Sequence, residues 1–392
     1  MQIAAVLLGL IYAAALLVSL LSLTAAIVFW KFLGKPRSHL AARATLILPL
    51  TGAAGNLERL LAALAAQTLA PQRLLIAVES EQDPAYRRAL ALSHSCDFPV
   101  EVVVAGLADA CAQKCWNQIA ALRRVDAQNE AVVLLDADIA PPPWWLSAVV
   151  TPLADGSADL VTGYRWPLVE RQALGVHLIA AIDRSIAVLP RFPWARAAWG
   201  GTLALSASAL RALELDKTIG RTLTDDCPIN DRAASLGLRV LTRRALLVPT
   251  HLRSGLGDAW RFGRRQYQII RIYRPKLWLL AFAAITIRLA AWVAIIESLP
   301  SSGALTAAVA LLALALAGAF VQQMIARRLD CADPPSVRIV QLGLAIGKPI
   351  VDLVHWTMIV SAFRTGSVVW GHVTYKVRGP FAIQVAQRIP WG

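Results

Sequence analysis

Charged residues are scarce in this chain of 392 residues. Only 16% of the residues are Asp, Glu, Lys or Arg, whereas 57% are hydrophobic and the mean hydropathy is +0.54. A soluble globular protein carries about 25% charged residues, so the composition excludes a wholly soluble protein. Because charge is absent from residues 3–30 and sparse in residues 277–362, the residues between them are expected to form one globular domain.

Cysteine is also scarce and unevenly placed. The chain has five cysteines, at positions 96, 111, 115, 227 and 331. Cys111 and Cys115 are four residues apart without histidine partners nearby, so neither a zinc site nor a disulfide framework is indicated. We expect small buried thiols in a reducing compartment.

Two common nucleotide-binding motifs are missing. The sequence has no Gly-x-Gly-x-x-Gly fingerprint and no P-loop, which argues against NAD chemistry and against a Walker-type ATPase. The net charge of +14 could suggest nucleic acid, but no RNP-like or zinc-finger pattern accompanies it. The basic residues gather beside apolar segments, notably in residues 261–276, which favours an anionic membrane face or a phosphate-bearing ligand over nucleic acid.

Residues 3–30 are long enough to cross a hydrocarbon core of about 30 Å as a helix. A cleaved signal peptide is the competing interpretation. Against it, the apolar run is too long, no basic region precedes it and no clear cleavage site follows. Positive charges follow the segment, so the N-terminus should lie outside and the next domain in the cytoplasm.

Three further apolar segments follow, at residues 277–296, 304–324 and 339–363. The first two are expected to form a hairpin through the short turn at residues 301–303. Lys348, Pro349, Asp352 and His355 interrupt the third, and charge at bilayer depth is costly. Because a third full crossing would place the basic tail outside, against the positive-inside bias, we expect a kinked, re-entrant or interfacial segment.

Between the membrane segments, short apolar runs alternate with helical patterns. The predicted strands are residues 44–50, 74–79, 100–104 and 132–135. One predicted helix follows Asn56, and another spans residues 111–124. This order predicts an α/β fold with a mostly parallel, doubly wound sheet. Beyond it, residues 158–162 and 201–205 are predicted strands, and residues 224–236 a predicted helix.

The buried run at residues 131–135 leads directly into Asp136-Ala137-Asp138, and a triple proline follows at residues 141–143. Ligands of open α/β sheets bind beyond the carboxyl ends of the strands. Strand side chains alternate between faces, so Asp136 and Asp138 are expected to point to the same side and share one cation or one pyrophosphate. A strand that merely ends in a polar turn is the alternative.

Four polar clusters are expected around one sheet edge. They are residues 79–83, the Asp136/Asp138 pair, the Asp225/Asp226 pair and the arginines of residues 261–271. Sugar transfer from a nucleotide diphosphate needs a carboxylate for the base or ribose, a carboxylate-held cation for the diphosphate, and a carboxylate base for the acceptor. One acid of the Asp225/Asp226 pair could instead serve only the helix dipole.

Several segments carry a resemblance to a known family. LPLTGAAGNLERLLAALAAQT, VESEQDPA, LLDADI, Trp199-Gly200-Gly201-Thr202 and Thr224-Asp225-Asp226 resemble, in order, motifs of the ceramide glucosyltransferase group of membrane-bound, inverting GT-A glycosyltransferases. That group includes bacterial glycolipid and hopanoid glycosyltransferases. The similarity covers about residues 44–278. The family's Gln/Arg-x-x-Arg-Trp signature is only partly present, because Gln266 stands in place of the tryptophan.

The resemblance implies a GT-A domain with a Rossmann-like, mostly parallel sheet, and it implies roles for particular residues. Asp226 would be the catalytic base, with Asp225 beside it, and Asp138 with Asp136 would hold Mg²⁺ or Mn²⁺. The donor nucleotide would be bound by Asp83, Glu79, Asp136 and Lys114. The diphosphate or acceptor would be bound by Arg264, Arg265, Gln266, Gly200, Gly201 and Trp199. The aromatic residues near Arg264 could equally form only a membrane-interface belt.

The expected organisation is a transmembrane helix (1–30), a GT-A domain (40–255), an interfacial helix (256–276), membrane segments (277–363) and a basic cytoplasmic tail (364–392). A multi-pass protein of a bacterial inner membrane with a cytoplasmic catalytic domain is implied. Its partners would be the bilayer, a UDP-sugar donor and a membrane lipid acceptor.

The predicted function is inverting transfer of glucose or a related hexose from a UDP-sugar to a ceramide- or diacylglycerol-like lipid. A hopanoid glycosyltransferase using UDP-N-acetylglucosamine is the alternative. A processive polysaccharide synthase and a non-catalytic lipid-binding scaffold are further hypotheses. The small number of membrane segments and Gln266 argue against the synthase, and the retained acids argue against the scaffold.

Overall fold

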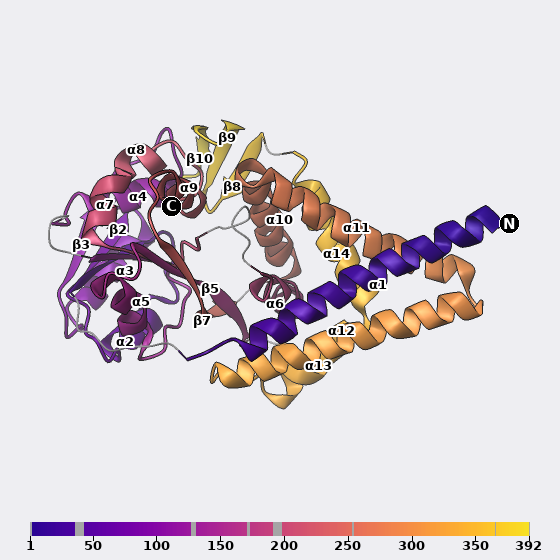
Figure 1. Cartoon of the computed structure of the whole chain (residues 1–392). Coiled ribbons are helices and arrows are strands. Elements are labelled where there is room, and N and C mark those ends of the chain that lie inside the picture. The colour runs from indigo at the N-terminus through magenta and orange to yellow at the C-terminus, as the bar shows by residue number, and fades with distance from the viewer. Residues whose placement is uncertain are drawn as a thin grey trace. The chain divides into compact units, whose positions relative to one another are not determined.

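The structure is a computed structural model that describes residues 2–35, 43–126, 131–170, 173–190, 198–252, 255–364 and 366–391. The chain divides into two compact units, drawn in Figure 1. The helical unit comprises Met1–Leu33, Trp166–Pro190 and Leu252–Arg364. The sheet unit comprises Gly34–Arg165, Arg191–His251 and Thr365–Gly392. The predicted domain boundary at residue 40 lies outside the described residues.

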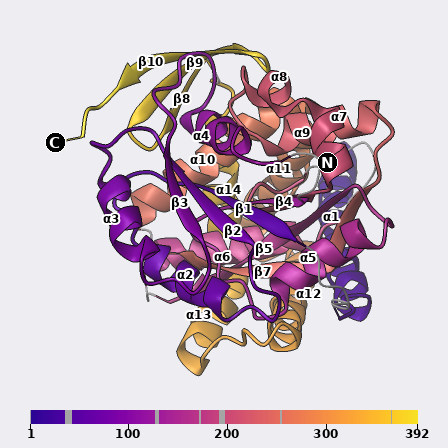
Figure 2. The ribbon, with the colours of Figure 1, turned by 90° about the vertical axis from the view of Figure 1, so that its left-hand side faces the viewer.

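A seven-stranded sheet in the order β3-β2-β1-β4-β6-β5-β7 organises the sheet unit. Figure 2 shows β3, β2, β1 and β4 next to one another. Strands β1 to β4 pair in parallel, whereas β6 runs antiparallel to both β4 and β5. The predicted mostly parallel α/β sheet is therefore confirmed. The strands are β1 (Ala44–Pro49), β2 (Arg73–Val78), β3 (Val100–Val104), β4 (Ala131–Leu135), β5 (Leu160–Val169), β6 (Thr202–Leu205) and β7 (Val240–Leu252).

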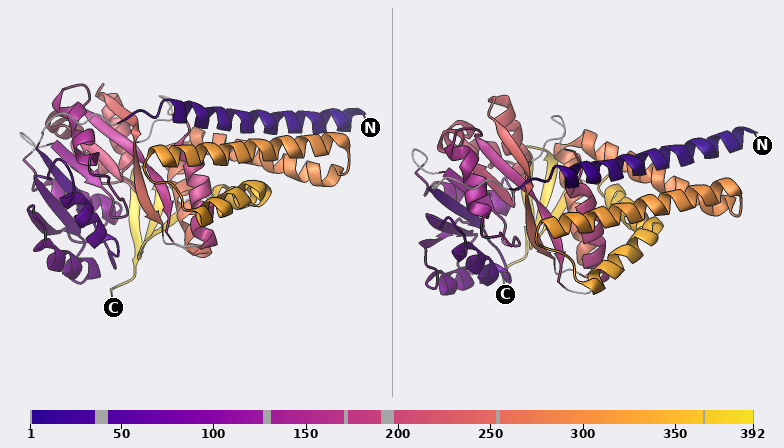
Figure 3. Two further views of the ribbon diagram at one scale, coloured as in Figure 1. Left: turned by 90° about the horizontal axis from the view of Figure 1, so that it is seen from below. Right: turned by 60° about the horizontal axis from the view of Figure 1, so that its bottom comes forward.

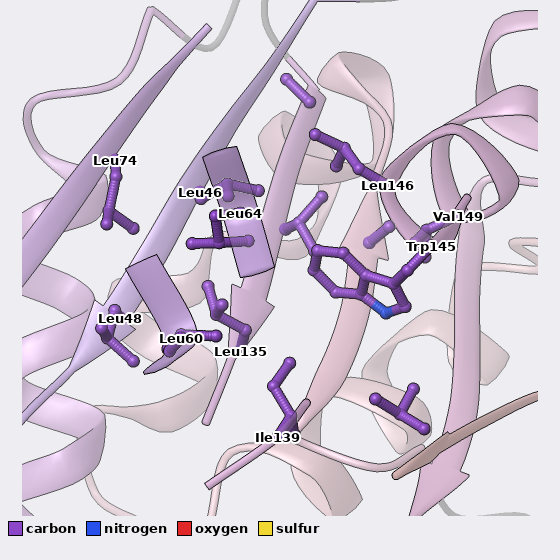
Figure 4. Packing of buried hydrophobic residues seen from close by; sticks show 14 of the residues in the cluster. Leu46, Leu48, Leu60, Leu64, Leu74, Leu135, Ile139, Trp145, Leu146 and Val149 are labelled. Atoms are coloured by element: carbon purple, nitrogen blue, oxygen red, sulfur yellow. The ribbon is translucent and has the colours of Figure 1, made fainter. Parts of the chain in front are cut away.

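The side chains of the central strands alternate between the two faces of the sheet. On one face, Leu46 and Leu48 of β1 and Leu135 of β4 pack with Leu60 of α2 and Trp145 of α5, as Figure 4 shows. All five side chains are fully or almost fully buried. Burial of apolar surface contributes about 25 cal/mol per Å² to stability. These buried side chains therefore stabilise the sheet that carries the polar residues at its edge.

Helix α4 packs against β1 and β2. The helices of this unit are α2 (Leu57–Ala65), α3 (Pro84–Ser93), α4 (Gln113–Leu122), α5 (Trp145–Ala154), α7 (Ala207–Leu213), α8 (Leu215–Ile219) and α9 (Asp226–Ser235). The bounds of α2, α4 and α9 agree with the three predicted helices to within a few residues, whereas α3, α5, α7 and α8 were not predicted.

Residues 366–391, for which no secondary structure was predicted, contain a second sheet. Its three antiparallel strands, in the order β10-β9-β8, are β8 (Ser367–Trp370), β9 (Val373–Gly379) and β10 (Ala382–Arg388). This sheet belongs to the sheet unit, although more than a hundred residues of the helical unit precede it in the chain.

Three helices of the helical unit are long and apolar enough to cross a membrane. They are α1 (Gln2–Lys31), α11 (Pro275–Ser298) and α12 (Ser302–Arg328). Figure 3 shows α1 and α12 side by side. The predicted hairpin between α11 and α12 is present, with its turn at residues 299–301.

The third apolar segment is broken, as predicted. It forms α13 (Pro335–Ile346) and α14 (Lys348–Ser361), which meet at Gly347. Each is shorter than the roughly 20 residues that a crossing requires. The remaining helices of this unit are α6 (Leu174–Ala187) and α10 (Leu256–Tyr273), the latter in the place of the predicted interfacial helix.

Candidate active site

The acidic motif after β4 forms a turn. The strand ends at Leu135, which pairs with Thr202 of β6, and residues 136–138 leave the ladder. The argument that strand alternation aligns Asp136 with Asp138 is therefore wrong, because neither residue is in the strand. The two carboxyl groups are nevertheless close: burial and the negative charge of Asp136 raise the pKa of Asp138 to about 6.

Two neighbouring segments hold this turn and the prolines after it. The backbone oxygen of Asp138 accepts a hydrogen bond of 2.9 Å from the backbone nitrogen of His251. Gln67, just after α2, donates from Nε2 to the oxygen of Pro142 at 2.9 Å and accepts from the backbone nitrogen of Leu146 at 2.9 Å. The loop is thus fixed at several points.

Lys114 on α4 connects the two acidic pairs. Its Nζ lies 2.8 Å from Oδ1 of Asp136 and 3.3 Å from Oδ2 of Asp225, a residue 111 positions later in the chain. Burial by itself would lower the pKa of Lys114, but the charges of Asp136 and Asp225 outweigh burial and raise it. Lys114 therefore stays protonated and holds the two acidic segments together.

Asp225 is completely buried. Its Oδ2 accepts a hydrogen bond of 2.6 Å from Nε2 of Gln118, one helical turn after Lys114 on α4. Burial would raise the pKa of Asp225, but the charge of Lys114 and the hydrogen bond from Gln118 lower it overall. Asp225 is therefore an ionised partner of Lys114 and is not accessible to a substrate.

Asp226 differs from Asp225 because it is only half-buried. Its Oδ1 accepts hydrogen bonds from Oγ1 of Thr224 at 2.8 Å and from the backbone nitrogen of Cys227 at 2.7 Å. Burial and the adjacent charge of Asp225 raise its pKa. A carboxylate with one oxygen fixed and a raised proton affinity is suited to act as a general base.

The glycines before β6 make room for this cluster. A Cβ atom on Gly200 would lie 2.8 Å from Oδ1 of Asp225 and 2.9 Å from Nζ of Lys114, and one on Gly201 would lie 2.3 Å from the ring of Trp199. The buried Trp199 ring in turn lies 6.0 Å from that of Tyr164. Gly200 therefore permits the close approach of the chain before β6 to the charged residues, and Gly201 leaves room for the Trp199 ring.

Glu79 and Asp83 follow β2, and both are buried. Asp83 caps α3 by accepting from the backbone nitrogen of Ala85 at 2.9 Å, and it also accepts from the backbone nitrogen of Gly52 at 2.7 Å and Oγ1 of Thr51 at 3.0 Å. It therefore shapes the loop after β1. Glu79 contacts residues of the second sheet, which are described below.

Polar side chains on two faces of α4 contact different neighbours. Lys114 and Gln118 contact Asp225, whereas Asn117 contacts the ends of β1 and β2 and Gln113 contacts the loop after β3. Nδ2 of Asn117 donates to the oxygen of Ala77 at 3.1 Å and its Oδ1 accepts from Nε2 of Gln113 at 2.8 Å. Residues four apart lie on the same helix face, so this one helix sets the spacing of the polar groups.

Arg264, Arg265 and Gln266 lie on α10 in the helical unit. The guanidinium of Arg264 lies 5.8 Å from the ring centroid of Trp260, and that of Arg265 lies 5.6 Å from that of Phe262. The structure brings together the predicted site residues of the sheet unit. Arg264, Arg265 and Gln266, in contrast, belong to the helical unit. Their predicted role toward diphosphate or acceptor stays a prediction.

The Asp136 and Asp138 carboxylates fit a divalent cation. Burial and the negative charge of Asp136 both raise the pKa of Asp138, and a bound cation would relieve the repulsion between the two carboxylates. Among the described residues, no group of three or more His, Cys, Asp or Glu side chains is arranged to hold a metal ion. One or two carboxylates with substrate phosphates is the usual protein environment of Mg²⁺, so this donor set suits a cation that arrives with a diphosphate.

Sequence reasoning missed two parts of the cluster. Gln118 was overlooked, although its position four residues after Lys114 places it on the same helix face. The contacts that residues 366–391 make with Glu79 were also missed, because no local pattern connects segments about 300 residues apart.

The order of the strands and the acidic turn at the carboxyl end of β4 define a GT-A-like α/β fold. The profile of Glycosyl transferase family 21 matches residues 4–381. The chain therefore belongs to this family, the family of the ceramide glucosyltransferases. The resemblance predicted from the motifs is confirmed at the level of the family.

Among solved structures, the chain is similar to the mannosyltransferase PcManGT from Pyrobaculum calidifontis in complex with GDP-Man and Mn²⁺. The identity is 19%, the match covers 90% of this chain and 96% of that chain, and the TM-score is 0.46. It is also similar to glucosyl-3-phosphoglycerate synthase from Mycobacterium tuberculosis in complex with Mn²⁺, UDP and glucosyl-3-phosphoglycerate, at 16% identity, 59% and 79% coverage and a TM-score of 0.35. No curated protein matches the chain.

Proposed function

We propose that this glycosyltransferase transfers a hexose, glucose or a related sugar, from a UDP-sugar to a hydroxyl of a membrane lipid with inversion. The acceptor is ceramide- or diacylglycerol-like, and the product is a glycolipid. The observation that carries the proposal is the arrangement of Lys114, Asp225 and Asp226, in which a buried ion pair supports a half-buried carboxylate of raised pKa.

Asp226 acts as the base in this proposal. The free oxygen of its carboxylate takes the proton of the acceptor hydroxyl while the acceptor oxygen bonds to the anomeric carbon. The bond between that carbon and the diphosphate oxygen breaks, and UDP leaves with the electron pair. A positioned base contributes about 10²–10⁴-fold to such a step.

Lys114 and Asp225 position the reacting groups. Lys114 fixes Asp136 through its 2.8 Å contact, and the negative charge of Asp225 adds to burial in raising the pKa of Asp226. Asp138 and Asp136 would hold Mg²⁺ or Mn²⁺, which neutralises charge on a diphosphate when bound. Arg264, Arg265 and Gln266 are assigned to the diphosphate or the acceptor head.

The lipid acceptor is supported by the three helices that are long and apolar enough to cross a membrane. We place the protein in a bacterial inner membrane, with the sheet unit on the cytoplasmic side. Lys31 at the end of α1 and Arg327 and Arg328 at the end of α12 are consistent with positive-inside orientation of those helix ends.

The test is transfer of labelled sugar by the purified, detergent-solubilised protein. Labelled UDP-glucose and UDP-N-acetylglucosamine are each offered with vesicles containing ceramide, diacylglycerol or a hopanoid, in the presence of Mn²⁺. We expect a glucosylated ceramide or diacylglycerol whose glycosidic bond is inverted relative to the donor by NMR. Transfer only to the hopanoid from UDP-N-acetylglucosamine would replace the proposed substrates, a polymeric product would indicate a processive synthase, and absence of transfer from all donors would contradict the proposal.

A further inference from the structure

Both carboxylate oxygens of Glu79, at the carboxyl end of β2, are engaged by the second sheet. Oε1 accepts a hydrogen bond of 2.7 Å from Nε1 of Trp391 and lies 2.8 Å from Nε2 of His372. Oε2 accepts from Nη1 of Arg388. The Glu79 side chain is 2% exposed. Because both oxygens are engaged and the side chain is almost completely buried, the carboxylate is not accessible to a donor ribose, and it acts as the anchor of residues 366–391.

Arg388 extends the attachment to α4. Its Nη2 donates to Oε1 of Gln113 at 2.8 Å and to the oxygen of Ala108 at 3.3 Å. The hydroxyl of Tyr375, a buried residue of β9, accepts from the backbone nitrogen of Gln113 at 3.0 Å. The second sheet is therefore attached to the helix that also carries Lys114, the residue that joins the acidic pairs.

This attachment places Trp391 at the edge where ligands of α/β sheets bind. A Cβ atom on Gly52, in the loop after β1, would lie 3.5 Å from the ring of Trp391. Gly52 has a φ of +69°, a conformation that glycine adopts readily, so the chain turns sharply beside the indole. The ring centroid of His372 lies 4.2 Å from that of Trp391, at an interplanar angle of 44°.

The chemistry of this group points to a planar aromatic ligand. Trp391 and His372 are both partly exposed, and Glu79 fixes their polar atoms, so their orientation is set before a ligand arrives. Base stacking on an aromatic side chain is sequence-tolerant and contributes about 1–3 kcal/mol per base. Open α/β sheets bind nucleotides beyond the carboxyl ends of their strands, and here that edge carries an oriented indole.

We propose that residues 366–391 form one wall of the donor site and that Trp391 stacks on the nucleobase of the nucleoside diphosphate, with Glu79 and His372 as positioning residues. This assignment rests on the proposed function. It gives Glu79 a role different from the direct donor contact expected from the sequence.

The test compares two probes that share the diphosphate but differ in the base. Binding of UDP and of inorganic pyrophosphate to the full-length protein is measured by calorimetry in the presence of Mn²⁺. We expect Trp391→Ala to weaken UDP binding at least about fivefold, the lower end of the stacking range, and to leave pyrophosphate binding unchanged. Trp391→Phe should recover most of the UDP affinity. The matched control is Phe381→Ala, because Phe381 is an aromatic residue in the turn between β9 and β10 that is 55% exposed.

Each other outcome has a distinct meaning. Equal UDP affinity in Trp391→Ala and the wild-type protein would overturn the stacking role. An equal loss for UDP and pyrophosphate would also overturn it, because a damaged fold affects both probes. If the wild-type protein binds pyrophosphate but not UDP, this result contradicts both the proposed uridine nucleotide donor and the proposed stacking of its base on Trp391. If it binds neither probe, the proposed function itself fails.

Discussion

Each unit buries an aspartate against a basic residue, but the two pairs are built differently. In the helical unit, Nη1 and Nη2 of Arg184 contact Oδ2 and Oδ1 of Asp333 at 2.5 and 2.9 Å, and Gln323 donates to Oδ2 at 2.8 Å. Arg184 also donates to the backbone oxygen of Pro167. Both carboxylate oxygens therefore have hydrogen-bond donors.

The pair in the sheet unit is incompletely satisfied. Lys114 and Gln118 both contact Oδ2 of Asp225, whereas its buried Oδ1 has no hydrogen-bond partner among the described residues. Half-buried Asp226 and Asp136 lie next to this pair. Removing one partner of a fully paired buried ion pair is strongly destabilising, whereas neighbouring carboxylates with perturbed pKa values are typical of functional sites. From this comparison we infer a structural role for Arg184, and we propose a catalytic role for the cluster around Lys114.

The largest effect is expected for the proposed base. Asp226→Asn removes the proton acceptor and should lower kcat by about 10²–10⁴-fold, with little change in the thermal unfolding midpoint. Rates are measured with labelled UDP-sugar and lipid acceptor. Asp231→Asn, on the exposed side of the same helix α9, is the matched control and should retain the wild-type rate. Undiminished transfer by Asp226→Asn would remove Asp226 from the base role.

The second prediction concerns the pair of the helical unit. Arg184→Met leaves Asp333 buried without its main partner, which should cost about 3–5 kcal/mol of stability. Arg123→Met removes a surface ion pair with Asp216 and should cost less than about 1 kcal/mol. Denaturant unfolding measures both losses. The protein that remains folded should keep its kcat, and a selective loss of kcat in Arg184→Met would contradict the comparison.

The third prediction tests the cluster of the sheet unit. Lys114→Met leaves Asp225 buried without a cation, so it should lower stability by about 3 kcal/mol and should lower kcat as well. Combining it with Asp225→Asn removes the unpaired charge, so stability should recover while kcat stays low. Unfolding and transfer are measured on the same preparations. Recovery of full activity in the double variant would show that the ion pair is only structural.

The smallest expected effect is a shift in pH dependence. Burial and the charge of Asp225 raise the pKa of Asp226, so Asp225→Asn should lower that pKa. The base acts when deprotonated, and activity rises as pH increases through its pKa. The acidic limb of the kcat/KM profile should therefore move to lower pH in Asp225→Asn. An unmoved acidic limb would show that the limb reports another group.

The central strands were predictable because each is a short apolar run that is buried on both faces. The turn at Asp136 to Asp138 was predicted as an extension of β4, since residue types alone do not show where the ladder with β6 ends. The strands β8 to β10 were not predicted, because their residue types also do not indicate a strand ladder. They alternate buried and exposed positions among basic and polar residues, and the basic composition suggested a tail.

The site was predictable where motifs carry it and unpredictable where distant segments meet. The family resemblance suggested roles for Asp226 and Lys114, but it did not indicate the contact of Lys114 with Asp225, which joins residues 111 positions apart. Glu79 illustrates the limit most clearly. Its place after β2 suggested a donor ligand, whereas its partners come from residues 372–391. Only the tertiary structure reveals that its carboxylate is already engaged.

The most direct test of lipid glycosylation is mass spectrometry of lipids from a bacterial host that expresses the protein and is supplied with ceramide. Cells with the wild-type chain should contain a ceramide or diacylglycerol species heavier by one hexose, and cells with Asp226→Asn at the same protein level should lack it. The same lipid profile in both cultures, with no hexose added to any lipid, would contradict the account.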